Sequence, residues 1–277
     1  MLRVLRISVF CLAIVLSQTL AAERQPARQA LPRAVVYYST EDPHWPKAEK
    51  VIDAVVKANP GLKLTRVSFD NVQGYWQLLD VERRLDIEPA GELTLVIGNI
   101  ALTSKGSRRD VETYFGGVVR ALRDPDKGRG RIRVDHSAFV RKTFGAEATA
   151  TFEGKPDGDD RLAPVIVGGK RVGWVIDAFR HIKCPTCIDM QCLIAVDLPK
   201  MRVLKVQPQR AIERYGVPVD AEDTGMFVDQ FEEWTPATPA VRVDAVVGAT
   251  KTCRTYVAVV RDVLKQIKRH EKEGREP

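Results

Sequence analysis

Long apolar runs, concentrated positive charge and low-complexity tracts are all missing from this chain of 277 residues. Beyond the first 22 residues, no segment has the roughly 20 consecutive apolar residues that a membrane-spanning helix needs. Lysine and arginine are scattered, and aromatic residues do not alternate with them, which argues against nucleic-acid binding. The composition, 44% apolar and 29% charged, is that of a globular protein that can form its own core.

The first 22 residues have the pattern of a secretory signal peptide. Arg3 and Arg6 precede the apolar run "ISVFCLAIVL", and the small residues of "TLAAE" suit a signal peptidase. No cysteine follows "SQTLAA", so a lipoprotein attachment site is absent there. We expect an exported, periplasmic protein that is soluble after cleavage, with a formal charge that falls from +7 to +5. An uncleaved signal that anchors the chain is the alternative.

Cysteine is scarce and clustered, because three of the four cysteines beyond the signal lie within nine residues, in "HIKCPTCIDMQC". The four are Cys184, Cys187, Cys192 and Cys253. In an exported protein they indicate two structural disulfides, one local and one between Cys192 and Cys253. The Cys-x-x-Cys at 184 and 187 also fits a redox dithiol, and all four thiolates together fit a zinc or iron–sulfur site. Haem attachment is excluded because Ile188 follows where histidine is required.

Residues 34–124 alternate between strand-like and helix-like patterns, between a flexible lead-in at 23–33 and a charged, glycine-rich linker at 125–131. This part is expected to be an α/β domain of the order β-α-β-α-β-β-α. Its main elements are strands at 34–40, 62–69 and 93–99, and helices at 47–59, 72–85 and 107–124.

That order resembles the thioredoxin-like fold. The family's chemistry does not carry over, because "EDPHWPKAE" lacks the Cys-x-x-Cys that begins the family's first helix. Leu93 stands where the family has a cis-proline. The resemblance therefore implies a domain without an active dithiol that serves as a scaffold or docking module. We expect His44 and Trp45 to lie in a solvent-facing turn.

Residues 132–277 are predicted to form a second, α+β domain. Strands are expected at 173–179, 192–199 and 201–209, a short amphipathic helix at 226–234, and a C-terminal helix at 252–273. Before that last helix, the valine-rich stretch "VDAVVGAT" ends in two small residues, Gly248 and Ala249, followed by the hydroxyl-bearing Thr250.

Over residues 160–270 the second part resembles the FMN-binding domain family. Members include the flavin subunits of Rnf and sodium-pumping NADH:quinone reductase complexes, and NosR-type regulators. The features that carry the resemblance occur in the family's order: "GGKRVGWVIDA", "LIAVDLPKMRVLKVQ", "ERYGVPVDAEDTG", "FVDQF" and Asp244-Ala245-Val246-Val247-Gly248-Ala249-Thr250. The resemblance implies FMN-binding by Asp244, Gly248, Ala249, Thr250, Lys251, Thr224, Gly225, Met226 and Phe227.

The resemblance also implies how the flavin is attached. An ApbE-type flavin transferase would join FMN to the Thr250 hydroxyl through a phosphodiester, beside slim neighbours and the start of a helix. Val247 replaces the family's usual serine or threonine, so both covalent and non-covalent FMN stay open. Thr250 or Thr252 as a plain helix cap is the alternative. Phe231 is expected to be core, and Phe227 is core or flavin contact.

We therefore expect an exported flavoprotein that carries electrons in an envelope redox chain, with envelope redox proteins as partners and no catalytic residue of its own. A second hypothesis is a scaffold or binding protein whose flavin site is degenerate. A third is a thiol oxidoreductase that uses Cys184 and Cys187. No metal is expected unless the four cysteines bind one, and a membrane is reached only through partners or an uncleaved signal.

Overall fold

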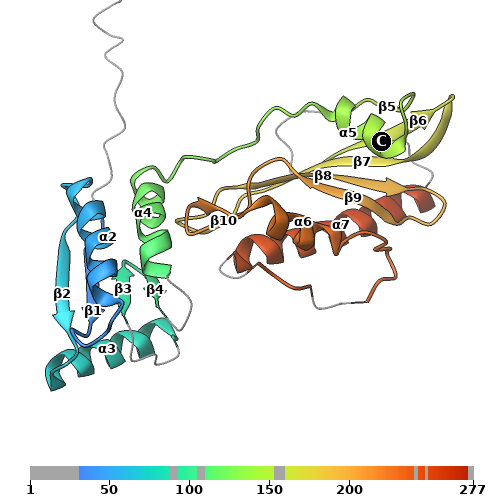
Figure 1. The fold of residues 1–277 in the computed structure, drawn as a ribbon. Coiled ribbons are helices and arrows are strands. Elements are labelled where there is room, and N and C mark those ends of the chain that lie inside the picture. Colours follow the sequence, from blue (N-terminus) through green and yellow to red (C-terminus); the bar gives the residue numbers. More distant parts are fainter. Residues whose placement is uncertain are drawn as a thin grey trace, which may run out of the picture. The chain divides into compact units, whose positions relative to one another are not determined.

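The computed structural model describes residues 31–87, 93–104, 110–152, 160–239, 243–246 and 249–273. The expected signal peptide and most of the lead-in lie outside these residues. The described chain has two parts, a mixed α/β sheet in the N-terminal half and an antiparallel five-stranded sheet in the C-terminal half (Figure 1). None of the helices in the described ranges combines the length and the apolar character needed to cross a bilayer.

The N-terminal part has the predicted order of elements. These are β1 (Ala34–Tyr38), α2 (Trp45–Lys57), β2 (Leu64–Ser68), α3 (Val72–Leu85), β3 (Thr94–Ile97), β4 (Ile100–Thr103) and α4 (Asp110–Arg123). The strands lie in the order β2-β1-β3-β4. β1 runs parallel to β2 and antiparallel to β3, and β4 is antiparallel to β3.

Helices cover both faces of this sheet, with α2 and α4 on one face and α3 on the other (Figure 1). Leu95 packs in the cluster with Ile52 of α2 and Phe115 of α4, whereas the next residue, Val96, packs with Leu78 of α3. Because helices cover both faces of the sheet, side chains on both sides of β3 are buried, and every residue of the strand is buried. A strand covered on both faces needs apolar residues at nearly every position instead of an alternating pattern.

The expectation for Trp45 was wrong. Its side chain is buried and stacks on Tyr38, with ring centroids 4.0 Å apart. As the first residue of α2, it lies where the helix begins to cover β1, and stacking removes a large apolar ring from water. His44, one residue earlier, is exposed as expected.

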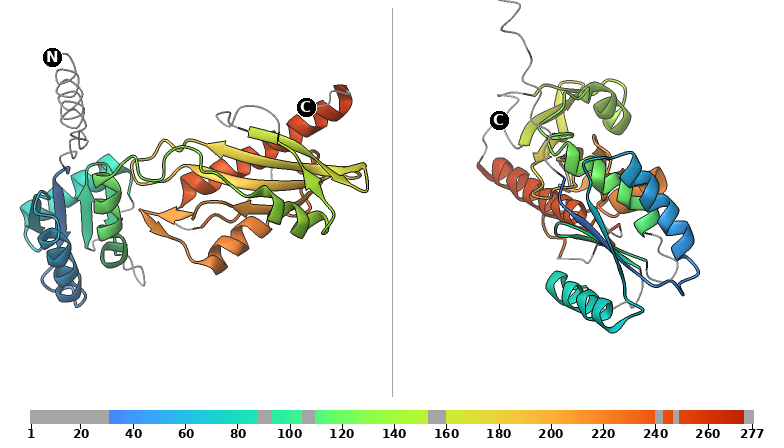
Figure 2. Two further views of the ribbon diagram at one scale, coloured as in Figure 1. Left: turned by 90° about the horizontal axis from the view of Figure 1, so that it is seen from above. Right: turned by 90° about the vertical axis from the view of Figure 1, so that its left-hand side faces the viewer.

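The C-terminal part is built on strands that pair antiparallel in chain order. They are β5 (Thr149–Ala150), β6 (Asp160–Val167), β7 (Lys170–Arg180), β8 (Met190–Asp197) and β9 (Val203–Pro208). Helices α6 (Ala221–Asp229) and α7 (Thr250–Glu273) cover one face, and α5 (His136–Phe144) covers the other (Figures 1 and 2). On β7, Trp174 and Ile176 join the cluster that contains α7, while Val175 joins the cluster that contains α5.

The helix expected at 226–234 starts earlier and ends at Asp229. The Asp220 carboxylate accepts a hydrogen bond from the Asp223 backbone N–H and caps the helix, which begins at Ala221, five residues before its expected start. Acidic residues in the first turn favour the same start. The predicted glycine-containing loop before it forms a short hairpin, β10 (Glu213–Arg214) and β11 (Val217–Pro218).

The segment from Arg129 to Ile132 is bound to the C-terminal sheet through buried polar side chains. Asp189 is 1% exposed and accepts hydrogen bonds from the Arg129 guanidinium (3.0 Å) and the Gly130 N–H (2.8 Å). The amide of Gln191 exchanges hydrogen bonds with the Ile132 N–H (2.8 Å) and C=O (3.1 Å). Much of the expected linker is thus fixed to the sheet.

Asp177, on β7, is the second buried carboxylate of this region and is 1% exposed. It contacts Arg131 (2.8 Å), His136 Nε2 (3.1 Å) and the Gln191 amide (2.9 Å). Burial alone would raise the pKa of Asp177, but hydrogen bonds from His136 and Gln191 and the charge of Arg131 outweigh it and lower the pKa. Asp177 is therefore ionised and paired in the folded protein.

Replacing Asp177 with asparagine should lower the free energy of unfolding by about 3 to 5 kcal/mol, because Arg131 loses its buried partner. A group with a lowered folded pKa stabilises the fold above its unfolded pKa of about 3.9, and this contribution is lost as the pH falls through the folded pKa. Acid should therefore destabilise the wild-type protein more steeply than Asp177→Asn. Urea unfolding at pH 7 and at a series of pH values below about 3.9 measures both effects.

The matched control is Asp80→Asn, whose carboxylate is exposed on α3 and forms a surface ion pair with Arg83. We expect it to change the free energy of unfolding by less than about 0.5 kcal/mol. Equal effects of the two variants would contradict the role given to Asp177.

Candidate functional site

Two segments singled out in the sequence are joined by one glutamine. Gln230 follows the last residue of α6, and its side chain pairs with the backbone of Asp244. Its Oε1 accepts from the Asp244 N–H (2.9 Å), and its Nε2 donates to the Asp244 C=O (3.1 Å). The same Nε2 also lies 3.3 Å from the Met226 carbonyl oxygen. The element "FVDQF" therefore holds the stretch that leads into "GAT".

A pocket of about 720 Å³ opens beside this contact. Its volume lies within the range of about 300 to 1,000 Å³ typical of small-molecule sites. Described lining residues come from α4, the β10–β11 hairpin, α6 and the segment 244–246. They are Thr113, Tyr114, Arg214, Val217, Pro218, Val219, Asp220, Asp223, Met226, Phe227, Gln230, Asp244, Ala245 and Val246.

The apolar side chains that line the pocket differ in exposure, and so in their ability to contact a ligand. Met226 is 58% exposed and can adapt its side chain to a bound ring. Phe227 is 1% exposed, and its ring packs edge to face on Phe231 and Tyr256, so it is mainly a core residue. Phe231 is fully buried, which confirms the expectation for it.

The charged lining of the pocket is mostly acidic. Asp220, Asp223 and Asp244 contribute carboxylates. The guanidinium of Arg214 is already paired with Asp110, with both contacts at 2.8 Å. A phosphate placed among these carboxylates would be repelled, so the pocket suits a neutral or ring-shaped group better than an anion.

The start of α7 offers a different environment. Thr250 is the first helical residue and is exposed, as is Lys251, whereas Ala249 is buried. The first backbone N–H groups of a helix have no partner within it and carry partial positive charge. Together with Lys251 they suit an anionic group. Val247 and Gly248 lie outside the described residues.

The predicted site residues are thus brought together only in part. Met226, Phe227 and Asp244 line the pocket, while Thr224 and Gly225 are half-buried in α6. Ala249, Thr250 and Lys251 follow the lining segment 244–246 in the chain but are not among the described lining residues.

Sequence reasoning missed Tyr114 and Arg214 as lining residues. The Arg214 guanidinium lies 4.4 Å from the centre of the Tyr114 ring, and these residues are one hundred positions apart in the chain. No local pattern signals such a contact. Gln230 belongs to the predicted element "FVDQF", but its contact with Asp244 depends on the tertiary structure.

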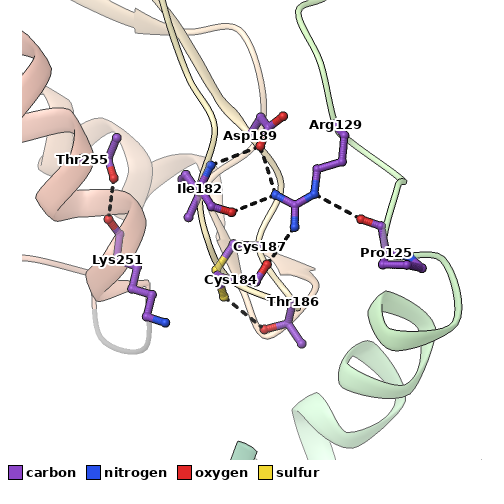
Figure 3. Close-up of a disulfide and its surroundings, with 9 residues drawn as sticks. All are labelled: Pro125, Arg129, Ile182, Cys184, Thr186, Cys187, Asp189, Lys251 and Thr255. Carbon is purple, nitrogen blue, oxygen red and sulfur yellow. Dashed lines mark hydrogen bonds and ion pairs between the residues drawn. A yellow bond between two sulfur atoms is a disulfide. The ribbon is translucent and has the colours of Figure 1, made fainter. Parts of the chain in front are cut away.

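The cysteines are paired only locally. Cys184 and Cys187 form a disulfide, as predicted (Figure 3). The expected bond between Cys192 and Cys253 was wrong, since both are free and buried. Each packs as a small apolar side chain in the cluster under α7, and burial raises the pKa of both thiols. A four-thiolate metal site would need the two sulfurs that the disulfide uses.

Comparisons with protein-family models, with curated proteins and with solved structures found no match. The functional argument therefore depends on the residues of this chain.

The link between Gln230 and Asp244 can be tested by substitution. In Gln230→Leu, the segment 243–246 loses both side-chain hydrogen bonds at nearly constant side-chain size. A net loss of about 1 to 1.5 kcal/mol corresponds to roughly tenfold faster exchange of the Asp244 amide hydrogen. Hydrogen exchange followed by mass spectrometry of peptides that contain this segment measures it.

Gln207→Leu is the control, because it makes the same chemical change at an exposed position of β9. Its effect on exchange in 243–246 should be negligible. If Gln230→Leu also leaves exchange unchanged, the glutamine does not hold the segment.

Proposed function

We propose that this chain is an exported flavoprotein that binds one FMN in its C-terminal part and carries electrons between redox proteins of the cell envelope. The observation that carries the proposal is the pairing of Gln230 with Asp244 beside the pocket of about 720 Å³. It joins the two sequence elements on which the resemblance to the FMN-binding domain family depends. The resemblance alone supplies the identity of the cofactor.

The size and walls of the pocket are compatible with a flavin. In the proposal, the flexible side chain of Met226 and the apolar Val246 cover the ring, and Tyr114 adds an aromatic wall. The acidic residues exclude the phosphate from the same space. The phosphate would instead lie at the start of α7, where backbone N–H groups and Lys251 favour an anion.

FMN, when bound, supplies the capacity to accept and donate electrons, and the protein supplies its position and surroundings. The residues of this chain then have two tasks. Gln230 fixes the segment 244–246 that lines the pocket, and the apolar walls limit access of water to the ring. The proposal requires no catalytic acid or base from the protein.

The N-terminal part is proposed to be a thioredoxin-like domain without thiol chemistry. Its strand order β2-β1-β3-β4, with β3 antiparallel to its neighbours, supports that fold. α2 begins with Trp45-Pro46 and carries no cysteine. Because a thiolate nucleophile is missing, the domain is proposed to dock or support rather than react.

Export is part of the proposal and depends on the signal-like residues 1–22. An ApbE-type flavin transferase of the same compartment would be the partner that attaches FMN. A scaffold protein with a degenerate flavin site is the competing function. The absorption spectrum of the purified exported protein separates the two, because bound flavin absorbs near 370 and 450 nm, both values approximate.

Covalent attachment at Thr250 gives a sharper test. Protein exported together with a flavin transferase is run on a denaturing gel and viewed under ultraviolet light. We expect a fluorescent band that disappears in Thr250→Ala, because the acceptor hydroxyl is removed from an exposed position at the start of α7. The band should persist in the control Thr252→Ala, whose side chain is buried two residues further along.

The outcomes separate the parts of the proposal. Flavin that binds and then washes away in denaturant contradicts the covalent link and leaves FMN binding intact. Fluorescence that survives in Thr250→Ala shows that another residue is the acceptor. A colourless protein after co-export with the transferase contradicts the flavoprotein proposal and favours a scaffold.

A further inference from the structure

The disulfide between Cys184 and Cys187 lies beside a second pocket, of about 260 Å³. Cys187 lines this pocket, whereas Cys184 is not among its described lining residues. The lining includes Pro185, Thr186, Lys127 and Glu213. Both cysteines are only half-buried, in contrast to the fully buried Cys192 and Cys253. Of the two cysteines, Cys187 is therefore the one that borders a space a ligand can enter.

The loop that carries the disulfide is held in place by contacts that do not depend on the disulfide. Arg129 donates hydrogen bonds to the carbonyls of Cys184 (2.8 Å) and Ile182 (2.9 Å), and its guanidinium pairs with Asp189 (Figure 3). At the other end, the Asp189 N–H donates to the Gly128 carbonyl (3.0 Å).

Close packing at Gly128 adds to these hydrogen bonds. A Cβ at this glycine would clash with the side chain of Ile188, which therefore packs directly against the backbone of Gly128. The loop can therefore keep its conformation when the disulfide is open. A disulfide between residues only three apart also closes a short loop and removes little chain entropy from the unfolded state.

The surroundings of Cys184 suit a departing thiolate. Its sulfur lies 3.7 Å from the hydroxyl of the buried Thr186, and the Arg129 guanidinium is held against its carbonyl. Hydroxyl donors and cations favour the thiolate form of cysteine, although Asp189 partly offsets the charge of Arg129.

We propose that Cys184–Cys187 is a redox-active disulfide that exchanges with a thiol seated in the pocket beside Cys187. The incoming thiolate attacks the Cys187 sulfur, a mixed disulfide forms, and Cys184 leaves as a thiolate. A second thiolate then attacks the sulfur of the incoming group, which releases a new disulfide and the Cys187 thiolate. Two electrons pass from two external thiols to the protein disulfide. This reaction goes beyond the proposed flavin function and does not require FMN.

The volume of the pocket limits the size of the molecule, or of the protein segment, that can carry the incoming thiol. A volume of about 260 Å³ lies below the usual range for drug-sized ligands, so it admits a cysteine side chain and a few neighbouring atoms. A small free thiol and an extended peptide with an exposed cysteine share this chemistry. Glutathione and a ten-residue peptide with one central cysteine serve as the two probes.

The first experiment treats the native, oxidised protein with each probe and traps thiols with an alkylating agent for mass spectrometry. We expect reduction of Cys184–Cys187 without denaturant, while Cys192 and Cys253 stay unmodified because they are buried. Faster reaction with glutathione assigns the pocket to small thiols, and faster reaction with the peptide assigns it to a protein segment. A disulfide that resists both probes until the protein is unfolded overturns the proposal.

Two single variants test which sulfur is attacked. Each variant is first loaded at its remaining loop cysteine with thionitrobenzoate, so that the leaving group is the same in both. Glutathione should then release the coloured thionitrobenzoate from Cys187 of Cys184→Ser at least about tenfold faster than from Cys184 of Cys187→Ser. Circular dichroism confirms that each variant is folded before the rates are compared. Equal rates, or faster reaction at Cys184, overturn the assignment of Cys187. The experiment on the wild-type protein does not depend on either variant.

A charge reversal at the pocket tests where the thiol enters. At low salt, Lys127→Glu should slow the anionic glutathione about threefold and speed the cationic thiol cysteamine by a similar factor. Lys63→Glu makes the same change at an exposed residue that is not among the described lining residues, and should alter neither rate. Identical behaviour of the two variants would show that the reaction does not pass through this pocket.

Discussion

Burial of both faces of β7 and β8 is the constraint on which the C-terminal part depends. Because the middle residues of these strands are buried on both faces, the polar groups among them must find partners inside the protein. Asp177 and Gln191 do so by binding the segment around Arg131 and Ile132, and Asp189 does so through Arg129. The charged residues of the expected linker are thus the partners of the buried carboxylates.

The same constraint places both candidate sites. Arg129 connects the buried Asp189 to the carbonyl of Cys184 and so positions the disulfide, which packs at the edge of the cluster under α7. α7 itself packs over β7 and β8, and its first residue, Thr250, follows the segment that Gln230 holds. The pocket next to Gln230 and the pocket next to Cys187 are consequences of one packed sheet.

Much of the fold could be predicted because the deciding information is local. Apolar runs indicated β7 and β8, and the order of elements in the N-terminal part was confirmed. β6 was missed, because its polar and charged residues interrupt the apolar pattern. The start of α6 was misplaced because the cap at Asp220 was overlooked. The burial of Trp45 was not predicted because its neighbours in the sequence are polar or proline, a pattern typical of an exposed turn.

The candidate site was predictable only where a motif is continuous in the chain. "FVDQF" and "VDAVVGAT" were both noted, and the fold brings them together through Gln230. Tyr114 and Arg214 come from remote segments, so only the tertiary structure reveals them. The local disulfide follows from the spacing of its cysteines, whereas spacing says nothing about Cys192 and Cys253.

The two buried thiols affect whether this protein can refold after partial unfolding. While α7 stays docked, Cys192 and Cys253 are kept from solvent and hold their protons. If the helix detaches in an oxidising medium, both thiols become reactive and can cross-link within or between chains. Refolding is then blocked by a covalent bond. In such a medium, the rate at which α7 opens, and not equilibrium stability alone, would set the lifetime of the native state.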